Sequence, residues 1–127
     1  MKRPVLLFVL LLVGLIGGWL FGVRQWYRSV RPAGPTLAEH LAQRPTPEQQ
    51  RVLAVEGREY LVLFGPIQAI PRFPSGWPVY IFNRTGQLVD WTPDEGDDEA
   101  FKKRWPGMFT GRAITRDEVA SWPGSGR

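Results

Sequence analysis

The segment VYIFNRTGQLVDW, residues 79–91, contains two runs of strand-forming residues on either side of a polar turn. Asn83 favours the start of a turn, and Gly86 can adopt the positive φ angle that closes one. The segment therefore predicts an antiparallel hairpin with strands at 79–82 and 87–91. This hairpin makes an antiparallel sheet the expected centre of the domain.

A third strand is expected at residues 60–64, Tyr-Leu-Val-Leu-Phe, which are apolar at every position. Such a run is typical of a strand that is covered on both faces. Helices are expected before it at 36–43 and 46–54, because Thr36 and Thr46 each begin a capping-box pattern and Pro47 suits a first helical position. The residues expected to face the core are Leu37, Leu41, Val52, Leu53 and Val55.

Residues 94–99 place five carboxylates in six positions, and the basic residues 102–104 follow after two apolar residues. A helix here would have acids at its first turn and bases at its last, which the helix dipole favours. The spacing does not fit the standard calcium loop. We therefore favour this structural interpretation over a cation site, whose ligands would be Asp94, Asp97 and Asp98. No metal or other cofactor is expected.

The remaining elements are short. A brief edge strand is expected at 112–114, and a capping-box pattern at Thr115 predicts a last helix that ends before Pro123. The fold class is therefore α+β, a small domain at 36–123 in which a three- or four-stranded antiparallel sheet packs against short helices. Residues 124–127 are expected to form a flexible tail.

Residues 5–23 form a run of 19 residues without a charge. As a helix, this run would span about 28 Å at 1.5 Å per residue, which matches a hydrocarbon core of about 30 Å. It is longer than the apolar core of a cleaved signal peptide and lacks a small-residue cleavage site. We therefore expect a transmembrane helix between a basic tail at 1–4 and a basic connector at 24–35.

The flanks of this helix carry similar positive charge, so the count of basic residues does not orient it. Because a short basic tail before an apolar run resembles an export signal, we expect a single-pass cell-membrane protein with its C-terminal domain outside the cytoplasm. Three basic residues after the apolar run are candidates for contact with lipid head groups, Arg24, Arg28 and Arg31.

Glycines recur at intervals of four within the apolar run. A helix places them on one face, where a second helix can approach closely. We expect this face to serve self-association or packing against a partner helix. The glycines are Gly14, Gly18 and Gly22.

The formal net charge of +4 is unevenly distributed. Residues 1–34 contain five basic residues and no acid, whereas the rest of the chain contains 11 basic and 12 acidic residues. No nucleic-acid partner is expected, because the domain lacks a uniform basic excess. The chain has no Cys, and His40 is its one imidazole. No catalytic residue is expected, since common nucleotide, hydrolase and metalloprotease motifs are missing from the sequence.

The segment 65–78 contains four prolines in 14 residues. Three side chains in it are candidates for contact with a protein or glycan partner: Arg72, Phe73 and Trp77. The competing interpretation is that the aromatic rings pack against the sheet. The sequence thus predicts a non-enzymatic interaction or structural module of the cell envelope. The alternative is an extracytoplasmic ligand-binding domain, with a cation at 94–99 or a sugar or peptide at 65–78.

Overall fold

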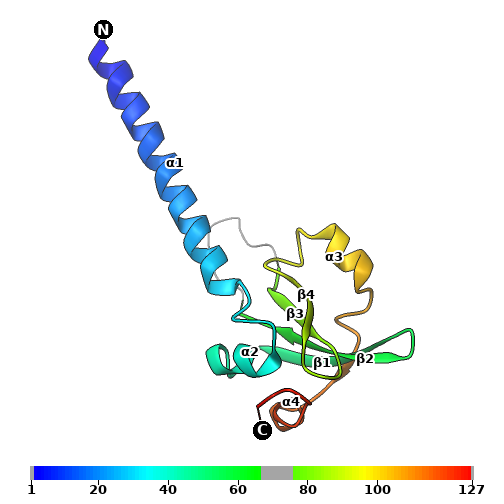
Figure 1. Ribbon diagram of the computed structural model, residues 1–127. Helices are drawn as coiled ribbons and strands as arrows, with labels where there is room; N and C mark the ends of the chain where they lie inside the picture. The colour runs from blue at the N-terminus through cyan, green and yellow to red at the C-terminus, as the bar shows by residue number, and fades with distance from the viewer. Residues whose placement is uncertain (1, 67–75, 127) are drawn as a thin grey trace.

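A computed structural model describes residues 2–66 and 76–126, and it shows a long helix followed by an α+β domain (Figure 1). The domain contains a five-stranded antiparallel sheet, one strand more than the sequence predicted, and short helices. In chain order the elements are α1 (Lys2–Val30), α2 (Leu37–Gln43), β1 (Gln49–Val55), β2 (Arg58–Phe64), β3 (Val79–Phe82), β4 (Leu88–Thr92), α3 (Glu99–Arg104), β5 (Arg112–Ala113) and α4 (Arg116–Ala120).

The strands lie in the order β4-β3-β2-β1-β5, so β2 is the central strand. Its last four residues are fully buried, as expected for a strand covered on both faces. Alternate residues of a strand point to opposite faces, and β2 accordingly contributes Leu61 and Leu63 to one cluster and Val62 and Phe64 to another.

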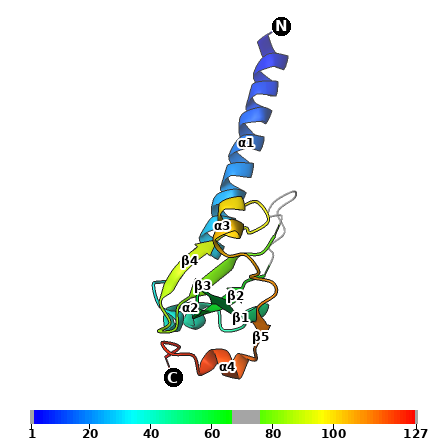
Figure 2. The same cartoon turned by 90° about the vertical axis from the view of Figure 1, so that its right-hand side faces the viewer.

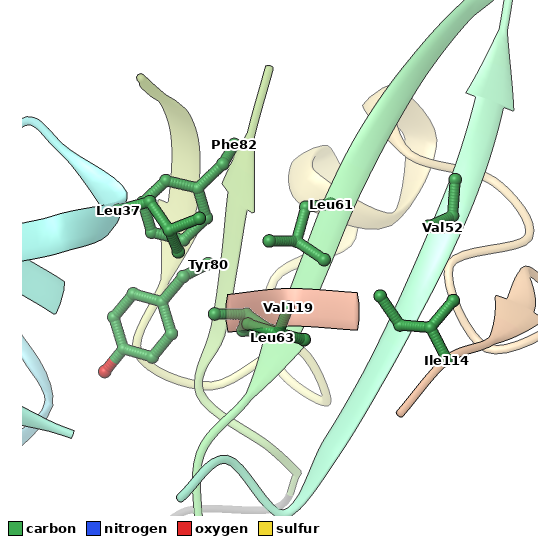
Figure 3. Close-up of a cluster of buried hydrophobic side chains, with 8 residues drawn as sticks. All are labelled: Leu37, Val52, Leu61, Leu63, Tyr80, Phe82, Ile114 and Val119. Carbon is green, nitrogen blue, oxygen red and sulfur yellow. The ribbon is translucent and has the colours of Figure 1, made fainter. Parts of the chain in front are cut away.

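The two clusters form the core of the domain. Helices α2 and α4 cover the first, whose buried side chains are drawn in Figure 3: Leu37, Val52, Leu61, Leu63, Tyr80, Phe82, Ile114 and Val119. Helix α3 and the segment after it cover the second: Leu53, Val62, Phe64, Val79, Ile81, Phe101 and Met108. Both faces of the sheet therefore bury apolar side chains.

The expectation of a helix at 46–54 is wrong, because most of that segment forms β1. This strand pairs with β2 along its whole length and connects to it through a two-residue turn. Glu56 and Gly57 form the turn with φ angles of 52° and 77°, the two positive values that suit a tight hairpin. The β-branched residues Val52 and Val55 favour a strand, and pairing with β2 outweighs the local helix-start pattern at Thr46.

The hairpin predicted at 79–91 is confirmed as β3 and β4. The carboxamide oxygen of Asn83 accepts hydrogen bonds from the amides of Thr85 at 3.1 Å and Gln87 at 2.9 Å. Gly86 has a φ of 79°, and a Cβ there would collide with the carbonyl oxygen of Pro123. The turn therefore needs glycine for both its backbone angle and its close packing against the end of the chain.

The free edge of β4 is partly covered by the chain itself. The amide of Leu88 donates to the carbonyl of Pro35 at 2.8 Å, and Thr36 forms a bridge with Gln87. Further along, the carboxylate of Asp90 accepts from the amide of Trp91 at 2.9 Å. The backbone amides of Leu88 and Trp91 thus already have partners.

Helix α3 begins where the acidic segment predicted it. Asp98 caps it by accepting from the amide of Phe101 at 2.9 Å. Within α3, Lys102 forms an ion pair with Glu99, three residues earlier, at 2.9 Å. The capping box expected at Thr115 is present at the start of α4.

Helix α1 continues through Val30 and so includes much of the segment expected as a connector. It leaves one end of the domain, while α4 and the C-terminus lie at the opposite end (Figure 2).

Within the segment expected as a flexible tail, the carbonyl of Gly124 accepts from the amide of Ala38 at 2.9 Å.

Candidate functional site

The last two turns of α1 pack against the domain, and we call this contact the junction. Beyond the apolar run, Trp26 and Val30 lie one turn apart and are 4% and 3% exposed. Arg24, Arg28 and Arg31 are exposed around them. The helix therefore changes from apolar on all sides to amphipathic, with one face buried against the domain.

The domain binds the carbonyl groups at the end of α1, which a helix leaves without internal partners. The Tyr80 hydroxyl donates to the carbonyl of Val30. Arg44 donates through Nη2 to the carbonyls of Ser29 at 2.5 Å and Arg31 at 2.8 Å. Because the C-terminal end of a helix carries partial negative charge, a guanidinium there is stabilising.

Aromatic rings connect the junction to the core. Tyr27 on α1 contacts Trp91 with ring centroids 5.9 Å apart, and Trp91 is nearly parallel to Tyr80 at 6.3 Å. His40 on α2 lies 4.5 Å from the Tyr80 ring and 5.4 Å from that of Phe82. The guanidinium of Arg44 also lies over Tyr80, 5.3 Å from the ring centre. One continuous set of rings thus links α1, α2, β3 and β4.

Burial changes the ionisation of two groups in this set. Burial, assisted by the positive charge of Arg44, lowers the pKa of His40 to about 3. Burial also raises the pKa of Tyr80 to about 12, against an opposing effect of Arg44. Both side chains are therefore neutral at pH 7. His40 is 3% exposed, which agrees with a packing role rather than that of a general base.

We expect the stability of the domain to fall on acidification because of His40. The unfolded chain binds a proton near pH 6.5, whereas the folded chain binds it near pH 3. The contribution of neutral His40 to the free energy of unfolding is therefore fully present above pH 6.5 and decreases toward pH 3. The free energy of unfolding falls by at most about 1.4 kcal/mol per pH unit in this range. Urea unfolding in detergent micelles at several pH values measures this slope.

His40→Phe is the matched control, because it retains a ring at this position without a titratable group. The carboxylates of the domain titrate in both proteins. The difference between the two curves of unfolding free energy against pH therefore gives the effect of protonating His40. Parallel profiles between pH 4 and 6.5 would show that protonation of His40 does not oppose folding.

A cavity of about 240 Å³ opens beside the junction. Its walls come from the end of α1, the end of α2 and the segments that flank β2 and β3. Of the described residues that line it, Arg28 and Arg44 are charged and none is a carboxylate. The junction therefore presents a small cationic cavity where α1 meets the domain.

The carboxylates of the acidic segment make contacts within their own loop and with neighbouring segments. Asp94 is buried and accepts from the amide of Gly96 at 3.1 Å, and Asp98 also accepts from the hydroxyl of Thr92 at 2.8 Å. Asp97 is exposed. Across residues 2–66 and 76–126, no three carboxylate or imidazole groups gather in a way that could hold a metal ion. The observed contacts favour the structural interpretation of this segment.

Asp90 has a structural role that its sequence context does not indicate. It accepts from Arg104 Nε and from Trp105 Nε1, each at 2.7 Å, and so joins β4 to the end of α3. Burial raises the pKa of Asp90, but the hydrogen bonds from Arg104, Trp105 and the Trp91 amide outweigh burial and leave the pKa below its ordinary value. An aspartate followed fourteen residues later by a basic-aromatic pair gives no local signal of this contact.

Of the three partner candidates at 65–78, Trp77 is described and Arg72 and Phe73 lie outside the described residues. The Trp77 ring meets Phe64 edge to face, with centroids 6.4 Å apart, and packs against the second cluster. Its backbone amide also donates to the carboxylate of Glu95 at 3.2 Å. This position favours the packing interpretation of Trp77 and gives no support to a sugar or peptide site centred on it.

The three glycines of α1 remain free of close neighbours. A Cβ built at Gly14, Gly18 or Gly22 would meet no atom within 4 Å. The apolar side chains around them are also largely exposed. Association through this glycine face stays a prediction.

The junction itself was not anticipated, since the segment 24–35 was expected as a connector. The local signal is that Trp26 and Val30 lie four residues apart. This spacing of apolar residues indicates that the helix continues beyond the apolar run with one apolar face. The partners Arg44 and Tyr80 lie 14 and 50 residues from Val30, so sequence alone could not pair them with it.

Comparison of the chain with protein-family models, with curated proteins and with solved structures yields no match.

Proposed function

We propose that the protein is a single-pass membrane protein whose α1 crosses the bilayer and carries the domain on a stiff stalk. The domain is a non-enzymatic interaction or structural module that lies outside the cytoplasm at the cell envelope. The observation that carries this proposal is the continuity of α1, which is long and apolar enough to cross a membrane and whose end is bound by the domain.

The exposure pattern of α1 supports membrane insertion. Its apolar window is not buried inside the structure, and large residues such as Leu7, Leu15 and Phe21 are more than half exposed. An uncovered surface of this size is costly in water and favourable in hydrocarbon. Arg24 and its exposed basic neighbours follow directly after the span, where anionic lipid head groups attract them.

The junction supports the idea of a stalk. An anchor joined by a flexible connector would allow the domain to tumble freely. Here Trp26 and Val30 are buried, and Tyr80 and Arg44 bind the last carbonyls. The domain is therefore held in one orientation relative to α1, with α4 directed away from the bilayer. The glycine face of α1 would add lateral contact with a second helix.

Extraction of membranes tests the insertion of α1. We expect the full chain to stay in the membrane pellet after an alkaline carbonate wash, and a chain without residues 5–23 to appear in the supernatant. The intact mass of the pelleted protein should include residues 1–4, because the anchor is not cleaved. Release of the full chain by carbonate, or a mass that lacks the apolar run, would contradict the proposal.

Reporter fusions test the orientation separately. A C-terminal reporter that folds only outside the cytoplasm should be active, and one that folds only in the cytoplasm should be inactive. The reverse pattern would place the domain inside while leaving membrane insertion intact.

A further inference from the structure

We propose that the cavity at the junction binds the phosphate group of an anionic phospholipid between Arg28 and Arg44. The inference rests on the proposed insertion of α1 and identifies a specific ligand for the surface that faces the bilayer. Its basis is the position, charge and size of the cavity.

The position of the cavity along α1 matches the head-group layer. Lipid head groups occupy about 5–8 Å on each side of the hydrocarbon core. Arg28 follows Val23, the last residue of the apolar run, by five residues, which is about 7.5 Å at 1.5 Å per residue. An arginine at this depth can reach the phosphates, because its long side chain extends toward the interface.

The charge of the cavity suits an anion. Arg28 is exposed, and no hydrogen bond or ion pair joins its guanidinium to another described residue. Arg44 is fixed by the carbonyls of Ser29 and Arg31 and by its contact with Tyr80. A guanidinium that is already ordered loses less entropy when it binds a phosphate.

The carbonyl end of a helix by itself would repel an anion. At the end of α1, Arg44 and Tyr80 donate to the carbonyls of Ser29, Val30 and Arg31 and so cover this negative end. The two arginines then determine the local charge. The contacts that fix the stalk thus also make the cavity suitable for a phosphate.

The size of the cavity favours a single head group. Its volume of about 240 Å³ lies below the roughly 300–1,000 Å³ of sites for drug-sized ligands. Polar side chains such as Gln43 complete its wall. A phosphate with a small head group attached to membrane-embedded chains suits such a space, and a free phosphate shares the same chemistry.

Lipid retention tests the proposal on the full chain. The protein is reconstituted in bilayer discs of equal phosphatidylglycerol and phosphatidylcholine, extracted into mild detergent, and analysed for bound lipid by native mass spectrometry. We expect preferential retention of phosphatidylglycerol. Arg28→Gln should lower the retained ratio of phosphatidylglycerol to phosphatidylcholine about fivefold, equivalent to about 1 kcal/mol for one arginine at the surface.

Arg24→Gln is the matched control, because it removes the same charge one turn earlier on α1 from a residue that does not line the cavity. Arg44→Gln should resemble Arg28→Gln, but it also weakens the junction, so Arg28→Gln decides the result. Equal loss of phosphatidylglycerol in Arg24→Gln and Arg28→Gln would mean diffuse attraction and would overturn the site.

A second arm identifies the source of the phosphate. In lipid-free detergent, inorganic phosphate should raise the unfolding temperature relative to chloride at equal ionic strength, and Arg28→Gln should abolish the rise. Phosphate binding without retention of phosphatidylglycerol would overturn the lipid assignment in favour of a soluble anion. If the protein resists carbonate extraction but shows neither lipid retention nor stabilisation by phosphate, this inference is overturned and the membrane anchor is unaffected.

Discussion

Phe82→Ala should lower the free energy of unfolding by about 3–5 kcal/mol, the usual cost of truncating a buried aromatic residue. Phe82 is fully buried on β3, in the cluster that joins the sheet to α2 (Figure 3). Its ring also meets that of His40 at 5.4 Å. Small domains have a total stability of about 5–15 kcal/mol, so the variant should be largely unfolded well below the temperature at which the unchanged protein unfolds.

Urea titration in detergent micelles, followed by tryptophan fluorescence, measures this loss. Val89→Ala is the control within the same hairpin, because Val89 is 45% exposed and its truncation should change stability by less than about 0.5 kcal/mol. A loss of under 1 kcal/mol for Phe82→Ala would be incompatible with the packing of β3 against α2.

Trp26→Ala should release α1 from the domain. Trp26 is a large side chain buried at the junction, and its truncation leaves a cavity in the apolar contact there, at a cost of about 3 kcal/mol. The hydrogen bonds from Arg44 and Tyr80 would remain, but each contributes only about 0.5–3 kcal/mol. We expect the domain to stay folded and to lose its fixed orientation relative to α1.

Spin-label distances detect this release directly. The chain has no Cys, so Gln25→Cys and Asp117→Cys, at exposed positions on α1 and α4, supply the two labels without further changes. The distance distribution should be narrow in the otherwise unchanged protein and broad in Trp26→Ala. Trp19→Ala is the matched control, because Trp19 is 58% exposed and its truncation should leave the distribution narrow. A narrow distribution in Trp26→Ala would show that Trp26 does not hold the stalk.

Much of the sheet could be predicted because its signals are local. The turn at Asn83 and Gly86, the apolar run of β2 and the cap of α3 at Asp98 each depend on residues within a few positions of one another. The error at β1 has a different cause. Thr46 and Pro47 carry a local preference for a helix start. The following segment forms a strand rather than a helix because it pairs with β2. Tertiary context outweighs a preference of this size.

The candidate site depended almost wholly on contacts between distant segments. Arg44 is a basic residue directly after α2, a position that is typical of the protein surface. Tyr80 belongs to a strand whose apolar residues are expected to lie in the core. Neither residue carries a local sign that it binds the end of α1. The basic residues after the apolar run indicated lipid contact, but the cavity beside Arg28 exists only because the domain packs against the helix.

The covered edge of β4 has a consequence for a domain held at a surface. Confinement to a membrane brings copies of a protein together in two dimensions, where each meets its neighbours far more often than in free solution. An open strand edge would then template sheet-to-sheet assembly. Pro35 and Thr36, which lead from α1 into α2, occupy part of that edge. In the proposed membrane-anchored protein, the segment that joins α1 to α2 would therefore also reduce the strand edge that is open to a neighbouring copy.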